Sequence, residues 1–295
     1  MLLKAVNSVL NQTFQDFEII ILDNDSSDNT EEEIMKLMAV HSCIKYVKNS
    51  KNIGIVANLN QIQAMVTSDY FCFLTDDDTY LPLFLNEAVK IFNKHFDIKA
   101  VAMRAPTVTN GKEVGCTLDH WDEGYYAAGS GIPNIIIGNH PTITNCLFSK
   151  KFAGDFFFDP SLGNSADGYI LLKLFTLHGV YVSQKVSGSW NLHDNSASMD
   201  KDWVDILSRK IKTANIYWKW IQKSQYSEYS CCVKFVSSFT AINVISKEAK
   251  NFTEIDRAFK NSEIASCISK NIPIFIANFM GRTLMLIYRY SVKHN

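Results

Sequence analysis

The chain has 295 residues, of which 47% are hydrophobic and 20% are charged, and its formal net charge is −1. This composition is that of a globular protein with a sizeable core, and the balanced charge argues against a nucleic-acid-binding role, for which a basic excess is expected. The seven cysteines show no metal-ligand spacing, and the N-terminus has no basic leader followed by an apolar run. We therefore expect a cytoplasmic protein with reduced thiols.

The first 105 residues alternate between helical and extended patterns. In chain order the patterns predict a helix with Leu3, Val6 and Leu10 on one face, a buried strand over 17–22, a polar turn over 23–29, a helix over 31–40, a strand over 44–47, a helix over 55–66 and a buried strand over 70–74. Pro82 is expected to open the next helix. Strands separated by helices predict a mostly parallel sheet, with ligands gathered beyond the carboxyl ends of the strands.

The rest of the chain divides into two stretches of different character. Residues 101–181 are richer in Gly, Asn and aromatic residues, as expected where loops shape an acceptor site. From residue 203 onward the periodicity is helical. We therefore expect a catalytic domain over residues 1–200 and a helical C-terminal extension over residues 201–295.

Three carboxylates, Asp76, Asp77 and Asp78, directly follow the strand predicted over residues 70–74. Like charges so close together repel one another, which favours a bound cation. Hard oxygen ligands suit Mg²⁺ or Mn²⁺, and either ion can bridge a diphosphate. Three isolated aspartates are more simply explained as a solvated acidic turn. The neighbouring segments must therefore distinguish a metal site from such a turn.

Several segments resemble, in order, the family 2 inverting glycosyltransferases. Residues 5–14 and 17–30 resemble that family's first helix and its second strand with the uridine-binding turn, and this pair is the most specific match. Asn52-Ile53-Gly54 and Asn58-Leu59-Asn60 resemble the approach to the metal-binding strand, while Phe158-Asp159-Pro160 and Ala166-Asp167-Gly168-Tyr169 resemble the segment that carries the catalytic base. The resemblance covers roughly the first two thirds of the chain, up to about Ser198.

The resemblance implies an α/β protein with the GT-A (nucleotide-diphospho-sugar transferase) fold, a mostly parallel sheet flanked by helices. It implies that Asp23, Asn52 and Asp76 bind the nucleotide sugar, and that Asp77, Asp78 and His193 hold Mg²⁺ or Mn²⁺. Asp77 is the best metal ligand, because the family places its metal-binding carboxylate five residues before the proline matched by Pro82. The first acid of the usual Asp-x-Asp pattern falls at Thr75 in this chain. Which of the three aspartates binds the metal therefore stays open.

Inverting transfer needs a base that removes the proton of the attacking hydroxyl, and a carboxylate can serve. By the resemblance this base is Asp167, although the family commonly has Glu-Asp where this chain has Ala166-Asp167. The alternative for Asp167 is a helix N-cap in front of the apolar residues 170–177. The alternative for His193 is a solvated loop histidine. Four aromatic residues could either stack on sugars or lie in the core: Trp121, Tyr125, Tyr126 and Trp190.

We therefore expect a metal-dependent glycosyltransferase that moves a sugar, preferably from a UDP-sugar, to a glycan or lipid-linked hydroxyl with inversion, as in the assembly of bacterial surface polysaccharide such as O-antigen. One alternative is an inactive nucleotide-sugar or glycan-binding remnant, because the apolar strand with which family members begin is absent ahead of the first predicted helix and the acidic motif is altered. Another is a sugar nucleotidyltransferase, which the lack of a glycine-rich phosphate loop disfavours.

The C-terminal residues 272–294 mix apolar with basic side chains. A helix with this composition can lie on an anionic membrane surface, which would place the enzyme peripherally on the inner face of the cell membrane. A helix that covers the core explains the same pattern equally well.

Overall fold

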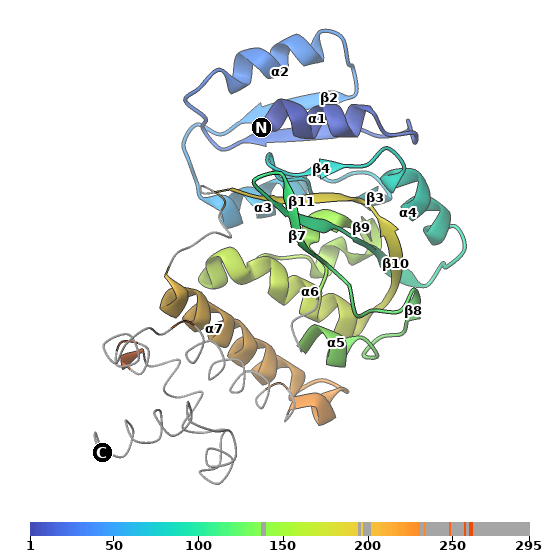
Figure 1. Cartoon of the computed structure of the whole chain (residues 1–295), viewed down its shortest axis with the longest axis vertical. Helices are drawn as coiled ribbons and strands as arrows, with labels where there is room; N and C mark the ends of the chain where they lie inside the picture. The colour runs from blue at the N-terminus through green and yellow to red at the C-terminus, as the bar shows by residue number, and fades with distance from the viewer. Residues whose placement is uncertain are drawn as a thin grey trace. The chain divides into compact units, whose positions relative to one another are not determined.

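The computed structural model describes residues 1–136, 140–193, 196 and 202–230, together with residues 233, 248, 257, 260 and 261 (Figure 1). It divides into two compact units, Met1–Met199 and Asp200–Asn295. The segment over residues 272–294, for which a membrane-surface helix is predicted, lies outside the described residues.

Helices and strands alternate in the first third of the chain, as the sequence predicts. The elements are α1 (Leu2–Leu10), β1 (Ile19–Asp23), α2 (Thr30–Met38), β2 (Ile44–Lys48), α3 (Ile55–Ala64), β3 (Tyr70–Phe71), β4 (Thr79–Tyr80) and α4 (Phe84–Phe92). Most bounds differ from the prediction by one or two residues, and two further differences are that β3 is shorter and that the helix after Pro82 begins at Phe84. Residues 81–83 form a turn there, in which the Phe84 amide donates to the Leu81 carbonyl.

The remaining elements of the first unit build most of its sheet structure. They are β5 (Ile98–Arg104), β6 (Pro106–Thr109), β7 (Lys112–Cys116), β8 (Gly124–Tyr126), α5 (Ile132–Ile136), η1 (Ile143–Asn145), β9 (Cys146–Ser149), η2 (Lys150–Asp155), η3 (Pro160–Ser165), α6 (Ala166–Leu177), β10 (Gly179–Val186) and β11 (Gly188–Leu192). In the described part of the chain the strand orders are β1-β2, β3-β9-β5-β10-β8 and β4-β11-β6-β7. Within these residues β1 pairs with β2 alone, and β3 pairs with β9 alone.

The strand pairing is more mixed than the alternating pattern predicts. β1 is parallel to β2, β5 to β10 and β6 to β11, but β9 is antiparallel to both β3 and β5. β6 and β7 form an antiparallel hairpin across Asn110 and Gly111, which both have positive φ angles, 51° and 73°. Such a pair suits a tight hairpin turn, which can join only antiparallel strands.

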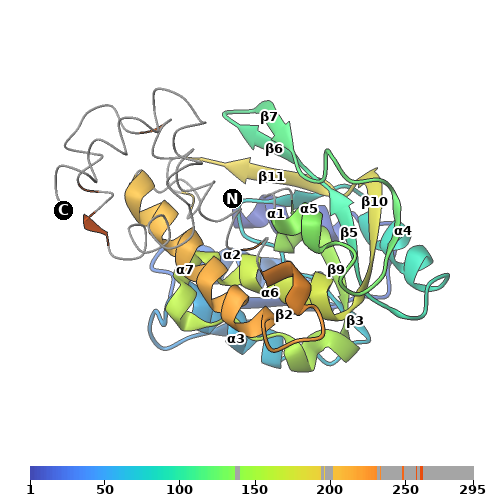
Figure 2. The ribbon, with the colours of Figure 1, turned by 90° about the horizontal axis from the view of Figure 1, so that it is seen from below.

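Helices cover both faces of the five-stranded sheet (Figure 2). α4 buries Phe84, Ala88 and Phe92 in one core cluster with Val101 and Met103 of β5. α6 contacts β10 and lies on the side of the sheet opposite to α4. Each large apolar side chain buried in this way contributes roughly 1.5–3 kcal/mol.

A cluster of six phenylalanines supports the strand that leads to the acidic residues. Its members are Phe71, Phe73, Phe148, Phe152, Phe156 and Phe158, all at most 8% exposed. Neighbouring ring centroids lie 5.1–6.3 Å apart, a spacing at which aromatic pairs attract one another. The cluster therefore joins residues 71–73 to residues 156–158, two segments that lead toward predicted site residues.

The second unit contains α7 (Trp203–Ile221) and a short turn, η4 (Ser227–Tyr229). The Asp202 carboxylate caps α7 by accepting the amide of Val204 at 3.1 Å, and it also pairs with Arg257. Across the described residues, no helix combines the length and the apolar character needed to span a bilayer.

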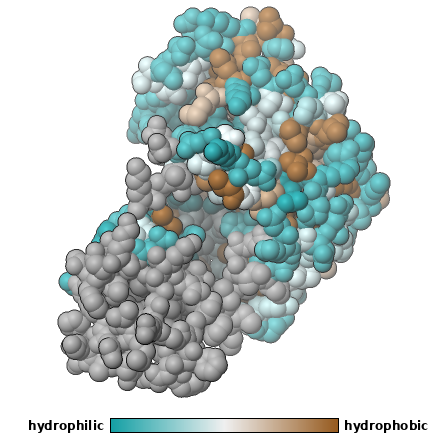
Figure 3. All heavy atoms as spheres, in the orientation of Figure 1, coloured by the Kyte–Doolittle hydropathy of each residue, from teal (hydrophilic) through white to brown (hydrophobic). Residues whose placement is uncertain are grey.

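The surface of the first unit is mostly hydrophilic, with separate apolar patches near α2 and near α4 on the face drawn in Figure 3. Exposed apolar side chains in these regions include Met35 and Val40, and Leu83 and Phe96. Isolated apolar side chains are normal on a protein surface and do not by themselves define a binding site.

Candidate active site

Asp23, a predicted nucleotide-binding residue, ends β1 and is 5% exposed. Its Oδ1 accepts the amide of Ser26 at 2.8 Å, and its Oδ2 accepts the hydroxyl of Tyr46 at 2.6 Å. Burial raises the pKa of Asp23, but the hydrogen bonds from Tyr46 and Ser26 outweigh burial and hold this pKa below its usual value. Asp23 is therefore an anion near neutral pH, fixed at the carboxyl end of a parallel strand.

A network of side-chain amides surrounds this turn. Asn24 donates to Oδ1 of Asn52 at 3.0 Å, and that oxygen also accepts the amide of Gly54 at 2.9 Å. Asn49 donates to Oδ1 of Asn24 at 3.3 Å, and its backbone amide donates to the Asp23 carbonyl at 2.8 Å. The network brings the predicted residues Asp23 and Asn52 into one neighbourhood. No sequence motif points to Tyr46 or Asn49, and Asn24, although it lies within residues 17–30, has no predicted role of its own.

The three consecutive aspartates have three different environments. Asp76 is exposed, and its carboxylate makes no hydrogen bond or ion pair with any residue the structure describes. Asp77 is partly exposed, and its Oδ2 lies 3.3 Å from Nε2 of His193 and 3.4 Å from the hydroxyl of Ser196. The structure therefore brings together Asp77 and His193, two of the predicted metal ligands, from distant parts of the chain.

Asp78, the third predicted metal ligand, points into the protein and is 2% exposed. Its Oδ1 accepts the backbone amide of Asn191 at 2.8 Å, and its Oδ2 accepts the hydroxyl of Thr75 at 3.0 Å. The side-chain amide of Asn191 also donates to the Asp77 carbonyl at 3.0 Å. These bonds join the acidic turn to β11, and so they set where His193 lies relative to Asp77.

Burial raises the pKa of Asp78 to about 6, and the nearby Asp77 charge adds to this effect. A folded-state pKa above the unfolded one means that ionised Asp78 lowers stability as the pH rises through about 6, whereas below about 4 this cost is absent. We expect Asp78→Asn, which cannot ionise, to raise the free energy of unfolding at pH 8 by about 1–3 kcal/mol. Urea unfolding with a chelator present, at pH 8 and pH 5, measures this difference, which should shrink at the lower pH.

Asp76→Asn is the matched control for this measurement, because it removes the same charge from an exposed position in the same turn. Its unfolding midpoint should stay close to wild type at both pH values. An Asp78→Asn protein no more stable than wild type at pH 8 would show that the Asp78 carboxylate is not a destabilising charge.

The donor set at Asp77 suits a divalent cation held jointly with a substrate. Within the described part of the chain, no three His, Cys, Asp or Glu side chains converge as a ready cage for an ion. Mg²⁺ commonly takes only one or two carboxylates from the protein and completes its shell with water and substrate phosphates. The carboxylate of Asp77 and the imidazole of His193, whose side chains are 18% and 31% exposed, match that arrangement.

Asp167, the predicted base, lies in the first turn of α6, where Ser165 is the N-cap. The alternative prediction, that Asp167 caps this helix, is therefore wrong, because the helix begins at Ala166 instead of near residue 170. Burial raises the pKa of Asp167, while the Gly168 amide, which donates to its Oδ1 at 2.7 Å, and the charge of His140 act in the opposite direction. A carboxylate with a raised pKa is a stronger base than an ordinary aspartate.

The aromatic candidates divide between core and surface. Trp121 is 3% exposed and packs against Phe175 and Tyr126, so it belongs to the core. Tyr125 is 45% exposed, and its hydroxyl donates to Asp97 at 2.9 Å.

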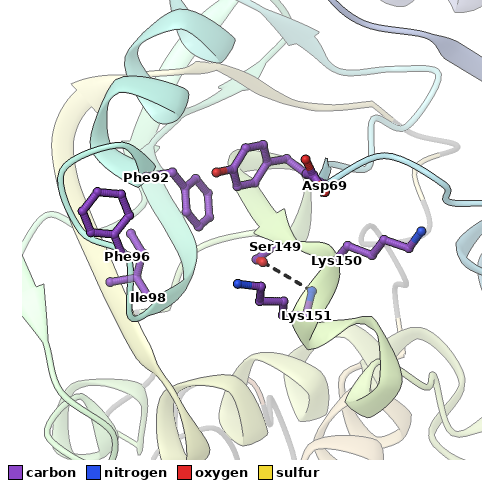
Figure 4. Close-up of a pocket in the computed structure, with 8 residues that line it drawn as sticks. Asp69, Phe92, Phe96, Ile98, Ser149, Lys150 and Lys151 are labelled. Carbon is purple, nitrogen blue, oxygen red and sulfur yellow. Dashed lines mark hydrogen bonds between the residues drawn. The ribbon is translucent and has the colours of Figure 1, made fainter.

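A cavity of about 470 Å³ lies on the first unit (Figure 4). It is lined by Asp69, Tyr70, Phe92, Phe96, Ile98, Ser149, Lys150 and Lys151. Phe92, Phe96 and Ile98 group on one side of it, while Asp69 and Lys150 lie on the other. None of these lining residues is a predicted site residue. The acidic residue of the cavity, Asp69, precedes β3, whereas the three consecutive aspartates follow it.

The chain is similar to curated glycosyltransferases over short stretches. It is 26% identical over 98 residues to an uncharacterized glycosyltransferase of Haemophilus influenzae, covering 33% of this chain and 30% of that one. It is 37% identical over 79 residues to the GalNAc(5)-diNAcBac-PP-undecaprenol beta-1,3-glucosyltransferase of Campylobacter jejuni, covering 26% of each chain. The chain thus spans about a third or less of the length of these relatives.

Solved structures share the fold over most of the chain. S. aureus TarS 1-349 in complex with UDP-GlcNAc has a TM-score of 0.71 at 15% identity, covering 91% of this chain and 78% of that one. The mannosyltransferase PcManGT from Pyrobaculum calidifontis, in complex with GDP-Man and Mn²⁺, has a TM-score of 0.54 at 11% identity, covering 92% of this chain and 82% of that one. The predicted GT-A fold is therefore confirmed.

A family model described as glycosyl transferase family 2 matches residues 1–152, more than half of the chain. The matched residues include Asp23 and the three aspartates, whereas Asp167 and His193 lie beyond them. The chain belongs to glycosyl transferase family 2.

Proposed function

We propose that this protein transfers a sugar from a nucleotide-sugar donor, preferably a UDP-sugar, to a hydroxyl of a glycan or lipid-linked acceptor with inversion at the anomeric carbon. The observation that carries the proposal is the pairing of Asp77 with His193, at 3.3 Å, in which Asp77 lies between β3 and β4, within the residues that the family model matches. The UDP-GlcNAc complex of TarS supports the choice of donor class. We assign this activity to residues 1–200, with residues 201–295 as a helical extension.

In the proposed reaction the donor nucleotide lies at the turn after Asp23 and the neighbouring loop that contains Asn52, with the exposed Asp76 beside the sugar. Asp77 and His193 would hold Mg²⁺ or Mn²⁺, which neutralises the charge that develops on the departing diphosphate. Asp78 orients this pair through Asn191. Its buried, hydrogen-bonded carboxylate is better suited to that task than to direct ligation.

The chemical step is a single displacement. The oxygen of the acceptor hydroxyl forms a bond to the anomeric carbon while the bond from that carbon to the diphosphate oxygen breaks. The hydroxyl proton passes to the carboxylate of Asp167, and the nucleotide diphosphate leaves with the bonding electron pair. No covalent link between sugar and protein is needed.

The proposed function is tested by incubating the purified protein with a panel of nucleotide sugars, with Mn²⁺, with Mg²⁺ or with EDTA, and measuring the nucleotide diphosphate released. We expect release from one donor class, preferably UDP-sugars, in the presence of metal. A folded protein that binds a nucleotide sugar but releases nothing from any donor would instead identify a binding protein. Release of pyrophosphate from a nucleoside triphosphate and a sugar phosphate would identify a nucleotidyltransferase.

The raised pKa of Asp167 predicts how turnover depends on pH. The base acts only when ionised, so kcat/KM for the acceptor should fall about tenfold for each pH unit below the pKa of Asp167, and this acid limb should lie at a higher pH than an ordinary aspartate would give. Initial rates at saturating donor and low acceptor concentration from pH 4.5 to 8.5 measure the limb. A value of kcat/KM that stays constant down to pH 4.5 would contradict a base with a raised pKa at Asp167.

Membrane association stays part of the proposal. Residues 272–294, with their apolar and basic side chains, would hold the enzyme at a lipid-linked acceptor. Sedimentation with anionic vesicles, compared between the full chain and a chain in which Arg282 and Arg289 are replaced by glutamate, tests this part separately from catalysis.

A further inference from the structure

α3 contacts both the end of β1 that leads into the turn after Asp23, called the donor turn, and the segment that leads to Asp167. Asn58 of this helix binds the first, and Asn60 binds the second. Asn58 donates to the carbonyl of Leu22, the residue before Asp23, at 3.3 Å, and its Oδ1 accepts Asn49 at 2.9 Å. Asn60 contacts the other segment, near Phe158. Two side chains on one helix thus reach two parts of the candidate site.

Asn60 binds the backbone of Phe158 through both of its polar atoms. Its Nδ2 donates to the Phe158 carbonyl at 2.9 Å, and its Oδ1 accepts the Phe158 amide at 2.9 Å. Only a primary amide presents a donor and an acceptor side by side in this way, so Asn or Gln is required for the pair of bonds. The Phe158 side chain is fully buried against Phe73 and Phe156, which leaves its backbone little freedom to find other partners.

The chain between Phe158 and Asp167 is short and contacts two helices. Asp159 caps η3 by accepting the amide of Ser161 at 2.8 Å, and η3, which is kinked at Gly163, leads directly into α6. η3 also contacts both α3 and α6. These contacts connect the backbone at Phe158 with the first turn of α6, which carries Asp167.

We propose that Asn60 is a positioning residue that sets where the Asp167 carboxylate lies relative to the bound donor, an inference that rests on the proposed role of Asp167 as base. Asn60 acts through the Phe158 backbone and touches no reacting atom. Because α3 also holds the donor turn through Asn58, the helix fixes the spacing between donor and base. A shift of about 1 Å in such a spacing can lower a rate about 100-fold.

The experiment compares Asn60→Asp with Asn58→Asp, two isosteric variants on the same helix that add the same charge. In Asn60→Asp the carboxylate still accepts the Phe158 amide but opposes the Phe158 carbonyl. We expect kcat for transfer to fall about 10- to 100-fold, while the donor KM and the affinity for the nucleotide diphosphate, measured by calorimetry, change less than about twofold. Asn58→Asp should show the opposite pattern, in which nucleotide binding is weakened and kcat changes less than in Asn60→Asp.

Asn60→Gln keeps both polar groups on a longer side chain, so it should recover part of the lost kcat. Asn60→Ala, which removes both bonds to Phe158, takes the place of Asn60→Asp if that variant fails to fold. Wild-type kcat in Asn60→Asp, or parallel losses of kcat and donor affinity in both aspartate variants, would overturn the inference. Asp167→Asn distinguishes a failure of the proposed base from a failure of the positioning role. If Asp167→Asn is fully active, the proposed base is wrong, whereas an inactive Asp167→Asn beside a fully active Asn60→Asp refutes the positioning role alone.

Discussion

Asp77→Ala is expected to abolish metal-dependent release of nucleotide diphosphate, lowering kcat/KM at least about 100-fold. The substitution removes the partly exposed carboxylate that pairs with His193 and leaves that imidazole as the only member of the pair. Donor turnover measured across a titration of Mn²⁺ checks the result, and added metal should recover little of the lost rate. His193→Ala should lower kcat/KM less, by about 10-fold, because the carboxylate ligand Asp77 is retained.

Asp76→Ala is the matched control for Asp77→Ala, since it removes the adjacent carboxylate without touching the pair with His193. Its metal dependence should follow that of wild type, although its donor KM can rise if Asp76 contacts the sugar. If Asp76→Ala loses metal dependence and Asp77→Ala keeps it, the two aspartates have the reverse of the proposed roles.

Asp167→Asn should lower kcat for transfer by about 10²- to 10⁴-fold, the range that general base catalysis commonly contributes. The amide oxygen can still accept the Gly168 amide, so α6 should begin as it does in the wild-type protein. Donor affinity should be nearly unchanged, because the proposed base would contact the acceptor hydroxyl and not the donor. Transfer kinetics with a saturating acceptor, together with calorimetric titration of the nucleotide diphosphate, separate these two quantities.

Asp159→Asn provides the comparison for Asp167→Asn. It is the same chemical change in the same segment, and its oxygen can still accept the Ser161 amide that caps η3. We expect transfer rates near those of wild type. Equal losses in both variants would mean that the charge of the segment, and not the base at residue 167, governs the rate.

Local pattern predicted much of the first third of the fold. Acidic residues in the first turn of α2 and the continuous apolar run before Asp23 gave elements within a few residues of those observed. Residues 101–181 were predicted less well, because their strands depend on partners far away in the chain. The exception is the β6–β7 hairpin, because its turn, Asn110-Gly111, is a pair that favours such turns from local sequence alone.

The candidate site was predictable only as a set of separate residues. The resemblance gave Asp23, Asp77 and Asp167, but the three aspartates look alike in sequence, and only burial and hydrogen bonds distinguish Asp78 from its neighbours. Tyr46 is an ordinary tyrosine of a short strand until β2 pairs with β1 and brings its hydroxyl to Asp23. Such roles arise from strand register and long-range packing, which periodicity does not encode.

The bond between Asp78 and Asn191 joins residues 113 positions apart, and it has a consequence for the order of events during protein synthesis. The donor turn can form once β1 and β2 have paired and α3, which carries Asn58, has been made, within the first 64 residues. At about 5–20 residues per second, a ribosome needs roughly 6 to 26 more seconds to deliver β11 and His193 to the acidic turn. Until then the nascent chain exposes three neighbouring aspartates that lack both their amide donor and their histidine, so affinity for nucleotide can arise before the capacity to act on it.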